Sequence, residues 1–143
     1  MSDATYLVFL GTSKQGRATI DALASKGCKS IVATSRNPDP KRFGDAVSKV
    51  LPADFADPES IKAAIKESQA SRIWFTTDWY AISKPTREKE FLLGKSVIDA
   101  VLEVNKEKQQ VKHIVYSSVG NATTAHENVE HFRSKGEIGR AHV

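Results

Sequence analysis

Cysteine is almost absent from this sequence. Cys28 is the only one among 143 residues, so no disulfide can form within the chain. Long hydrophobic runs are absent too, because no apolar stretch approaches the roughly 18 residues that a membrane-spanning helix needs. The first residues, Met1, Ser2 and Asp3, do not open a signal peptide. We therefore expect a cytoplasmic protein that has no membrane anchor and that could also enter the nucleus.

Concentrated basic charge is missing as well. Lys and Arg number 21 against 17 Asp and Glu, and the two signs are interspersed, as in residues 106–108. Nucleic-acid binding would need a basic stripe or a recognition helix, so we expect no direct contact with nucleic acid. The net charge of +4 suits a small anionic ligand. No metal site is expected, because the histidines lie on different predicted elements without a second ligand at metal spacing. These histidines are His113, His126, His131 and His142.

Short apolar runs rich in β-branched residues alternate along the chain with longer amphipathic segments, which predicts strands separated by helices. The predicted strands cover residues 6–10, 30–35, 47–51, 72–77 and 111–118. Helices are predicted up to residue 26, after residue 57 and over residues 87–108. Residues 39–46 are expected to form a loop or one loose helical turn, residues 120–128 a loop, and residues from 129 onward another helix.

The helix boundaries follow from capping residues. Gly27 can take a positive φ and so end the first helix. Asp57 as N-cap and Pro58 at the first helical position begin the second. One face of this second helix carries Ile61, Ala64, Ile65 and Ser68. The apolar stripe predicted for the long helix comprises Phe91, Gly94, Ile98, Val101, Leu102 and Asn105, with Lys95 and Lys106 outside it.

Strands separated by helical crossovers predict a largely parallel sheet with helices on both faces. We expect one α/β domain, a three-layer Rossmann-type doubly wound sheet of about five strands in the order 3-2-1-4-5. In such sheets ligands bind at the carboxyl ends of the strands, near the point where the strand order reverses. The residues that follow each strand are therefore the candidates for a site.

The turn after the first strand is suited to a phosphate, since a strand that feeds a helix through a tight turn directs backbone N–H groups and the positive helix end at one spot. Gly11 can form the turn and Gly16 can allow close helix packing, but Ser13 stands where a dinucleotide-binding turn has its middle glycine. A plain strand-to-helix turn remains an alternative. No lysine follows Gly16 as in a P-loop, and no nucleophile-elbow serine is present.

The other strand ends carry residues with two interpretations each. Arg36 lies about 20 residues beyond the turn and is either a 2′-phosphate ligand or a solvated surface charge. Asp54 and Phe55 could contact an adenine, or Asp54 could form an Asx turn. The Thr76 and Thr77 hydroxyls could line a cofactor, and Ser117 could hold a substrate carbonyl or be a turn residue.

Several of these stretches together resemble the NmrA-like proteins, which are atypical members of the short-chain dehydrogenase/reductase superfamily. The resemblance extends to about Gly136 and is most specific over residues 111–119 and 131–135, where the latter is similar to the family's His-Phe-x-x-Lys. It implies an NADP(H)-binding Rossmann domain. Family members include redox-sensing regulators that bind the dinucleotide without turnover, and also reductases and quinone reductases.

The resemblance also implies roles for individual residues. Arg36 would bind the 2′-phosphate and Lys135 would contact the nicotinamide ribose. Asp54 and Phe55 would lie by the adenine, and Thr76 and Thr77 along the ribose. The residues implied to hold the diphosphate are Gly11, Thr12, Ser13, Lys14, Gln15 and Gly16.

The chain departs from the family in its turn, which in the family reads Gly-x-x-Gly-x-Gln-Gly. Aligned on Gln15 and Gly16, the two earlier glycines become Leu10 and Ser13, whereas a one-residue deletion would make Gly11 the first glycine. A side chain at Ser13 crowds the diphosphate, yet its hydroxyl could donate to a phosphate. The sequence leaves both alternatives open.

A second departure concerns catalysis. Reductases of this superfamily use Tyr-x-x-x-Lys, and here the residue four before Lys135 is His131. Imidazole can transfer protons near neutral pH, so Lys135, His131 and Ser117 remain candidate catalytic residues. Because regulators of the family also depart at this position, we predict a sensor that could contact a regulatory protein partner. An NADPH-dependent oxidoreductase of small carbonyl or quinone substrates is the alternative.

The end of the sequence predicts an incomplete domain. NmrA-like proteins usually have about twice this length, so residues 1–136 are expected to form the first part of an NAD(P)-binding domain. Residues 137–143 fit poorly into the helix expected there, with Gly139 in its path. They match one reading frame of a widely used sequencing adapter. We therefore expect these seven residues to be a non-native tail, which resequencing of the transcript would test.

Overall fold

The computed structural model describes residues 4–118, 135 and 137–138. The described strands form a five-stranded parallel sheet in the order β3-β2-β1-β4-β5. They are β1 (Tyr6–Val8), β2 (Ile31–Ser35), β3 (Lys49–Pro52), β4 (Arg72–Phe75) and β5 (His113–Tyr116). The structure confirms the predicted α/β class and strand order.

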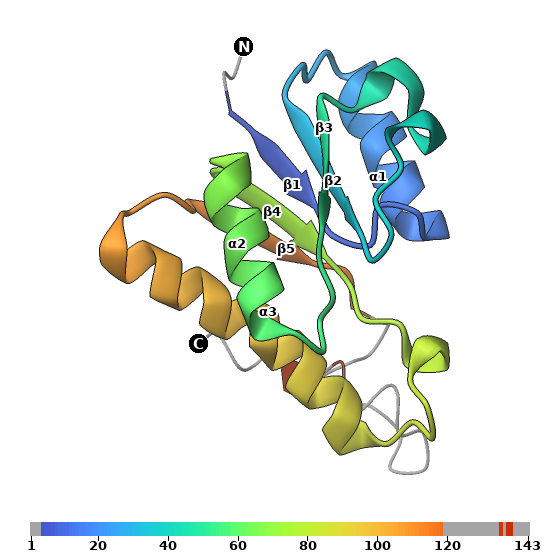
Figure 1. Ribbon diagram of the computed structural model, residues 1–143, viewed down its shortest axis with the longest axis vertical. Coiled ribbons are helices and arrows are strands. Elements are labelled where there is room, and N and C mark those ends of the chain that lie inside the picture. Colours follow the sequence, from blue (N-terminus) through green and yellow to red (C-terminus); the bar gives the residue numbers. More distant parts are fainter. Residues whose placement is uncertain (1–3, 119–134, 136, 139–143) are drawn as a thin grey trace.

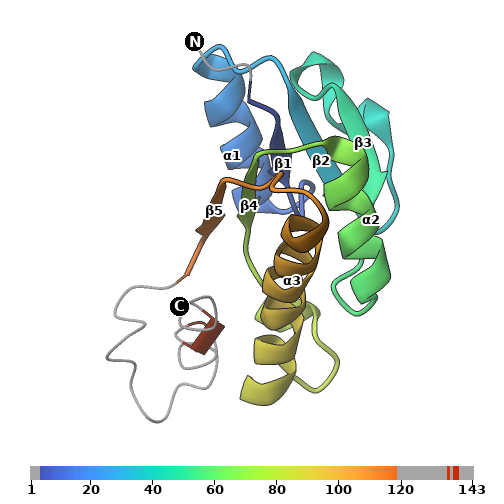
Figure 2. The same ribbon diagram turned by 90° about the vertical axis from the view of Figure 1, so that its left-hand side faces the viewer.

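Helices cover both faces of this sheet. One face is covered by α1 (Lys14–Ser25), and the other by α2 (Pro58–Ser68) and α3 (Arg87–Glu107), as the view of Figure 2 shows. In the part of the chain that the structure describes, three short 3-10 helices lie in the connections: η1 (Pro40–Arg42), η2 (Gly44–Ala46) and η3 (Trp79–Ala81). Residues 39–46, which were predicted to form a loop or one loose helical turn, therefore contain two short 3-10 helices, η1 and η2.

The core has one apolar cluster on each face because alternate residues of a strand point to opposite sides. In β1, Leu7 belongs to the cluster beneath α2 and α3, whereas Val8 packs with Ile20 of α1. The predicted apolar face of α2 is confirmed, since its buried residues are Ile61, Ala64, Ile65 and Ser68.

The stripe predicted for α3 is wrong at one position, because the Leu102 side chain is 54% exposed. Gly94, Ile98 and Val101 are buried as predicted, while Phe91 and Asn105 are half-buried. The buried residues of α3 also include Glu90, in its first turn. A carboxylate inside the buried stripe was not predicted.

Each strand is one or two residues shorter than predicted at one end or both, since the flanking residues lead into loops, although β3 extends one residue further, to Pro52. The predicted stop of α1 is confirmed: the helix ends at Ser25, and Gly27 follows with φ +85°. Asp57 is the N-cap of α2 as predicted, although its side chain makes no capping hydrogen bond. The predicted loop over residues 120–128 and the helix start at residue 129 lie outside the described residues.

Two described residues of the predicted tail contact α3. Glu137 forms an ion pair with Arg87 at 3.5 Å. The Ile138 side chain packs closely against Gly94, since a Cβ added to Gly94 would lie only 2.6 Å from the Cδ1 atom of Ile138. The origin of residues 137–143 remains a prediction.

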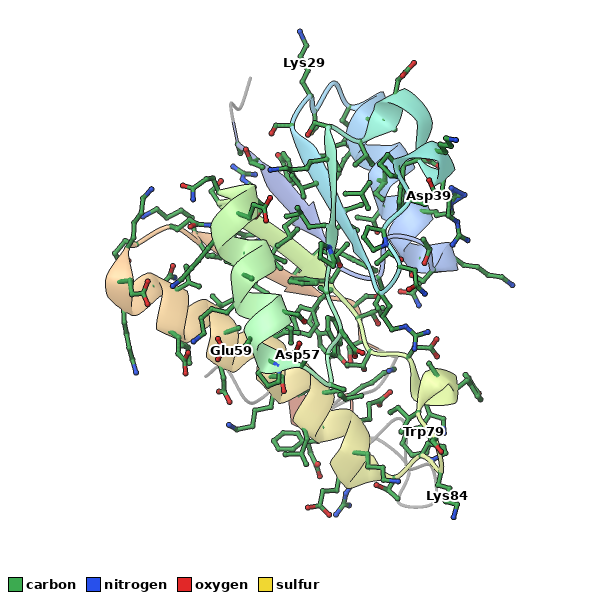
Figure 3. The ribbon with its side chains drawn as sticks, viewed as in Figure 1. Lys29, Asp39, Asp57, Glu59, Trp79 and Lys84 are labelled. Carbon is green, nitrogen blue, oxygen red and sulfur yellow. The ribbon has the colours of Figure 1, made fainter. Side chains whose placement is uncertain are left out.

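The carboxyl ends of all five strands lie at the same end of the sheet (Figure 1). The strand order reverses between β1 and β4, because β2 and β3 extend the sheet on one side of β1 while β4 and β5 extend it on the other. In Figure 3, Asp57 and Trp79 lie toward this end and Lys29 lies at the opposite one. Ligands of such sheets bind at this reversal.

Candidate functional site

The turn between β1 and α1 is built around one left-handed residue. That residue is Leu10, with φ +52°, and not Gly11. A leucine there carries a strain of roughly 1–2 kcal/mol that a glycine would avoid. Leu10 therefore takes the conformation expected of a first glycine, which favours the alignment without a deletion.

The two glycines of the turn are required by close packing. A Cβ on Gly11 would lie 2.9 Å from the Ala33 Cβ on β2. A Cβ on Gly16 would collide with the carbonyl oxygen of Leu10 and lie 2.9 Å from its carbonyl carbon. Gly16 thus lets the first turn of α1 pack directly against the backbone that follows β1. This is the close helix packing predicted for the third glycine of the turn.

Ser13 is the N-cap of α1. Its hydroxyl donates to the Leu10 carbonyl oxygen at 2.7 Å and accepts from the Gly16 amide at 3.0 Å. Both hydrogen bonds of the Ser13 hydroxyl are therefore made within the turn. The backbone amides of Thr12, Lys14 and Gln15, in contrast, donate to no oxygen within the described chain. Three unpaired amides at a helix N-terminus are the donors that a candidate anion site requires.

The end of β2 carries a free cation. Arg36 is exposed, and among the described residues it has no hydrogen-bonding or ion-pair partner.

At the end of β3, in contrast, both candidate residues have partners within the chain. The Asp54 carboxylate accepts from the Ala56 amide at 2.9 Å in an Asx turn, and the Phe55 ring packs edge-on against Phe9 in the core, with centroids 5.5 Å apart. Phe55 is 9% exposed, whereas Asp54 stays at the surface.

Hydrogen bonds connect the ends of β4 and β5 to the first turn of α1. Thr76 Oγ1 donates to the Ser117 carbonyl oxygen at 2.9 Å, and Ser117 Oγ donates to Gln15 Oε1 at 2.5 Å. Ser117 therefore links β5 to the first turn of α1. Its hydroxyl proton is engaged by the Gln15 amide oxygen.

Beside this link lies a group that we call the Lys135 cluster, made of Lys135, Thr77, Glu90 and Tyr116. The Lys135 ammonium donates to the Thr77 carbonyl oxygen at 2.9 Å, to Thr77 Oγ1 at 3.0 Å and to Glu90 Oε2 at 2.8 Å. Thr77 Oγ1 and the Tyr116 hydroxyl lie 3.1 Å apart. Burial raises the pKa of the Tyr116 phenol well above its usual range, outweighing the Thr77 hydrogen bond, which acts to lower it. The Tyr116 phenol is therefore a weaker acid than an ordinary tyrosine.

The structure thus brings together the turn at residues 11–16 with Thr76, Thr77, Ser117 and Lys135, and it places Arg36 and Asp54 at the ends of the neighbouring strands. His131 lies outside the described residues. Sequence reasoning missed Glu90 and Tyr116 as members of the site. A signal for Glu90 was present, because a carboxylate four residues before Gly94 occupies the buried face of α3.

Within the described part of the chain, no three His, Cys, Asp or Glu side chains form a group that could hold a metal ion. The described helices include none with the length and apolar character required to cross a membrane.

Comparisons with known proteins agree with the fold. A family model described as the NmrA-like family matches residues 2–142. An Aspergillus versicolor protein, the NmrA-like family domain-containing oxidoreductase notA′, is 27% identical over 117 residues, which cover 80% of this chain and 32% of that protein.

Two solved structures share the fold at low identity. The leucoanthocyanidin reductase–NADPH complex from Vitis vinifera matches with a TM-score of 0.74 and 15% identity over 96% of this chain and 43% of its own. The enzyme WbmH from Bordetella bronchiseptica in complex with NAD+ has a TM-score of 0.70 and 15% identity over 97% of this chain and 51% of its own. The chain therefore spans about half of each solved structure and about a third of the Aspergillus protein.

Proposed function

This chain belongs to the NmrA-like family, and on that premise we propose that it binds NADP(H) at the carboxyl ends of its strands. The observation that carries the proposal is the continuous set of contacts from Gln15 through Ser117 to Thr76, with the Lys135 cluster beside it. The unpaired amides and the Lys135 ammonium therefore lie at the same end of the sheet. A dinucleotide, with a diphosphate at one point and a nicotinamide ribose at another, matches this arrangement.

The residues present fit the dinucleotide. The amides of Thr12, Lys14 and Gln15 would hold the diphosphate, and the Arg36 guanidinium would pair with a 2′-phosphate. The Vitis vinifera reductase was solved with NADPH and WbmH with NAD+, which supports a nicotinamide dinucleotide as the ligand class. Arg36 favours NADP(H) within that class.

We propose further that binding occurs without efficient turnover, so that the protein senses the dinucleotide and regulates a protein partner. Among the described residues, three side chains near the end of β4 could transfer a proton, and the surroundings of each one disfavour that transfer. Lys135 uses its three N–H groups on Thr77 and Glu90, and Ser117 donates to Gln15. Burial raises the pKa of the Tyr116 phenol, which makes it a weak proton donor. His131 replaces the tyrosine that reductases of the superfamily use.

The alternative is an NADPH-dependent oxidoreductase that acts on small carbonyl or quinone substrates. The Aspergillus versicolor relative is described as an oxidoreductase, which favours this second candidate. In it, Lys135 would orient the dinucleotide, and His131 or Ser117 would assist proton transfer.

One pair of measurements separates these candidates. NADPH is titrated against the intrinsic fluorescence of Trp74 and Trp79, and its oxidation is followed at steady state with a panel of carbonyls and quinones. Tight binding without oxidation of NADPH supports the sensor. Turnover that Lys135→Ala abolishes supports the oxidoreductase. Absence of NADPH binding rejects both and leaves a degenerate scaffold.

Ser13 should limit the affinity for NADPH, because its hydroxyl occupies the Gly16 amide that a phosphate would otherwise accept from. We expect Ser13→Gly to bind NADPH about tenfold more tightly by calorimetry, which corresponds to one charge-assisted hydrogen bond gained. Glycine is also an adequate N-cap, so the free energy of unfolding should change by only a few tenths of a kcal/mol.

Ser13→Ala is the matched control. It frees the same amide but keeps the Cβ, so the difference between the two variants measures the crowding of the diphosphate. Removal of the cap should lower the free energy of unfolding by about 1 kcal/mol. A Ser13→Gly protein that binds NADPH no more tightly than wild type would contradict the assignment of Ser13.

A further inference from the structure

One ion pair among the described residues is shielded from solvent. Glu90 Oε2 and Lys135 Nζ are 2.8 Å apart, and the Glu90 and Lys135 residues are 0% and 8% exposed. The other ion pairs of the described residues involve side chains that are at least partly exposed, such as Lys49 with Glu67. A buried pair is weak evidence for a stabilising role, because apolar residues of similar volume often serve the fold as well or better. The Glu90–Lys135 pair therefore calls for another explanation.

The pair fixes the ammonium at one place. An ammonium has three N–H groups, and those of Lys135 meet three oxygens: Glu90 Oε2, the Thr77 carbonyl oxygen and Thr77 Oγ1. Thr77 lies just beyond β4, and Glu90 lies in the first turn of α3. A negative charge is favourable near a helix N-terminus. The carboxylate is thus provided by the first turn of a helix of 21 residues.

From this geometry we infer that Glu90 is a positioning residue, whose carboxylate holds the Lys135 ammonium beside Thr77 at the dinucleotide site. Glu90 is fully buried and so acts on a ligand through Lys135 and not by contact. Without the carboxylate, the buried ammonium lacks its counter-charge and leaves this position. The ligand in this inference rests on the proposed function, whereas the pairing of Glu90 with Lys135 does not.

The pairing is tested first by thermal unfolding, without any dinucleotide. Glu90→Gln keeps the shape of the side chain and removes its charge, so it leaves Lys135 buried and uncompensated. We expect its Tm to fall by about 10 °C. Lys135→Met is expected to cause a similar fall. The double variant removes both charges and should lose clearly less than the sum of the two single changes.

The positioning role is tested by NADPH affinity in the same four proteins. We expect the Kd to rise about tenfold in Glu90→Gln, and at least as much in Lys135→Met, since each removes the Lys135 ammonium from its position beside the anionic dinucleotide. Glu90→Gln should add nothing in the Lys135→Met background, because the residue through which Glu90 acts is already gone. A merely structural role for Glu90 would weaken binding by the same factor in both backgrounds. Glu88→Gln, an exposed acid in the same helical turn, is the matched control and should bind as wild type does.

The outcomes separate the inference from the proposed function. If wild type binds NADPH and Glu90→Gln binds it equally well, the positioning role is wrong and the proposed function stands. If wild type does not bind NADPH, the proposed function is wrong, and the unfolding data alone decide the pairing. If Glu90→Gln fails to fold, the double variant is compared with Lys135→Met. A double variant that is also unfolded, or that loses the full sum in Tm, overturns the inference.

Discussion

Replacement of Gly16 by alanine is expected to abolish NADPH binding at micromolar concentrations and to lower the free energy of unfolding by about 3 kcal/mol. The new Cβ would collide with the carbonyl oxygen of Leu10 and lie 2.9 Å from its carbonyl carbon. These are backbone atoms, so the clash cannot be relieved by a rotamer change. The Leu10 backbone and the first turn of α1 must therefore move apart. Leu10 has little freedom to adjust, because it already holds a strained φ of +52°.

The loss of binding follows from the same displacement. In the proposed site, the amides of Thr12, Lys14 and Gln15 can donate to one phosphate only while the turn keeps its present conformation. Misplacement of two charge-assisted hydrogen bonds costs about 3 kcal/mol, which raises the Kd about 100-fold. Calorimetry with NADPH and urea unfolding measure the two effects separately.

Gly27→Ala is the control for this variant. Gly27 has φ +85° but an added Cβ would meet nothing within 4 Å. The substitution should cost about 1 kcal/mol of stability through backbone strain and leave the Kd unchanged, because Gly27 lies at the far end of α1. Equal losses of NADPH affinity in the two variants would show that the effect is general destabilisation and not the geometry of the turn.

Arg36→Ala is expected to remove the preference for NADPH over NADH. The Arg36 guanidinium is exposed and without a partner in the described chain, at the end of the strand next to β1. A bidentate contact with a 2′-phosphate contributes about 3 kcal/mol, so the ratio of the two Kd values should fall about 100-fold. The affinity for NADH, which has no 2′-phosphate, should change little.

Arg72→Ala provides the matched control at the other end of the sheet. Arg72 is also exposed, but it begins β4 and lies over the Tyr6 ring at 5.6 Å. Its removal should leave the ratio of the NADPH and NADH Kd values as in wild type. An unchanged ratio in Arg36→Ala would instead show that Arg36 is a solvated surface charge.

Local sequence patterns were sufficient for the fold because they coincide with the tertiary packing. The buried face of α2 follows from helical periodicity alone, and each crossover from strand to helix to strand implies a parallel neighbour. The error at Leu102 has a physical reason. An apolar residue beside the stripe satisfies the periodicity equally well, and only the packing of α3 on the sheet decides which side faces solvent.

The sequence was sufficient to predict which strand ends carry the candidate site residues. It was not sufficient to predict which side chains of the site bind one another. The sequence left the role of Ser13 open, since the direction of its hydroxyl depends on the left-handed conformation of Leu10, a residue that rarely adopts it. The Glu90–Lys135 pair joins residues 45 positions apart, beyond the reach of any periodic pattern. A buried carboxylate in an otherwise apolar stripe is the local sign that such a partner exists.

The most direct test of the dinucleotide site is an amide NMR titration of the 15N-labelled protein with NADPH. We predict that the largest shifts belong to the amides of Thr12, Lys14 and Gln15 and to Arg36, while residues at the amino ends of the strands, such as Lys29, stay in place. Saturating NADPH that leaves the turn between β1 and α1 unperturbed, or that shifts only the opposite end of the sheet, would contradict the account.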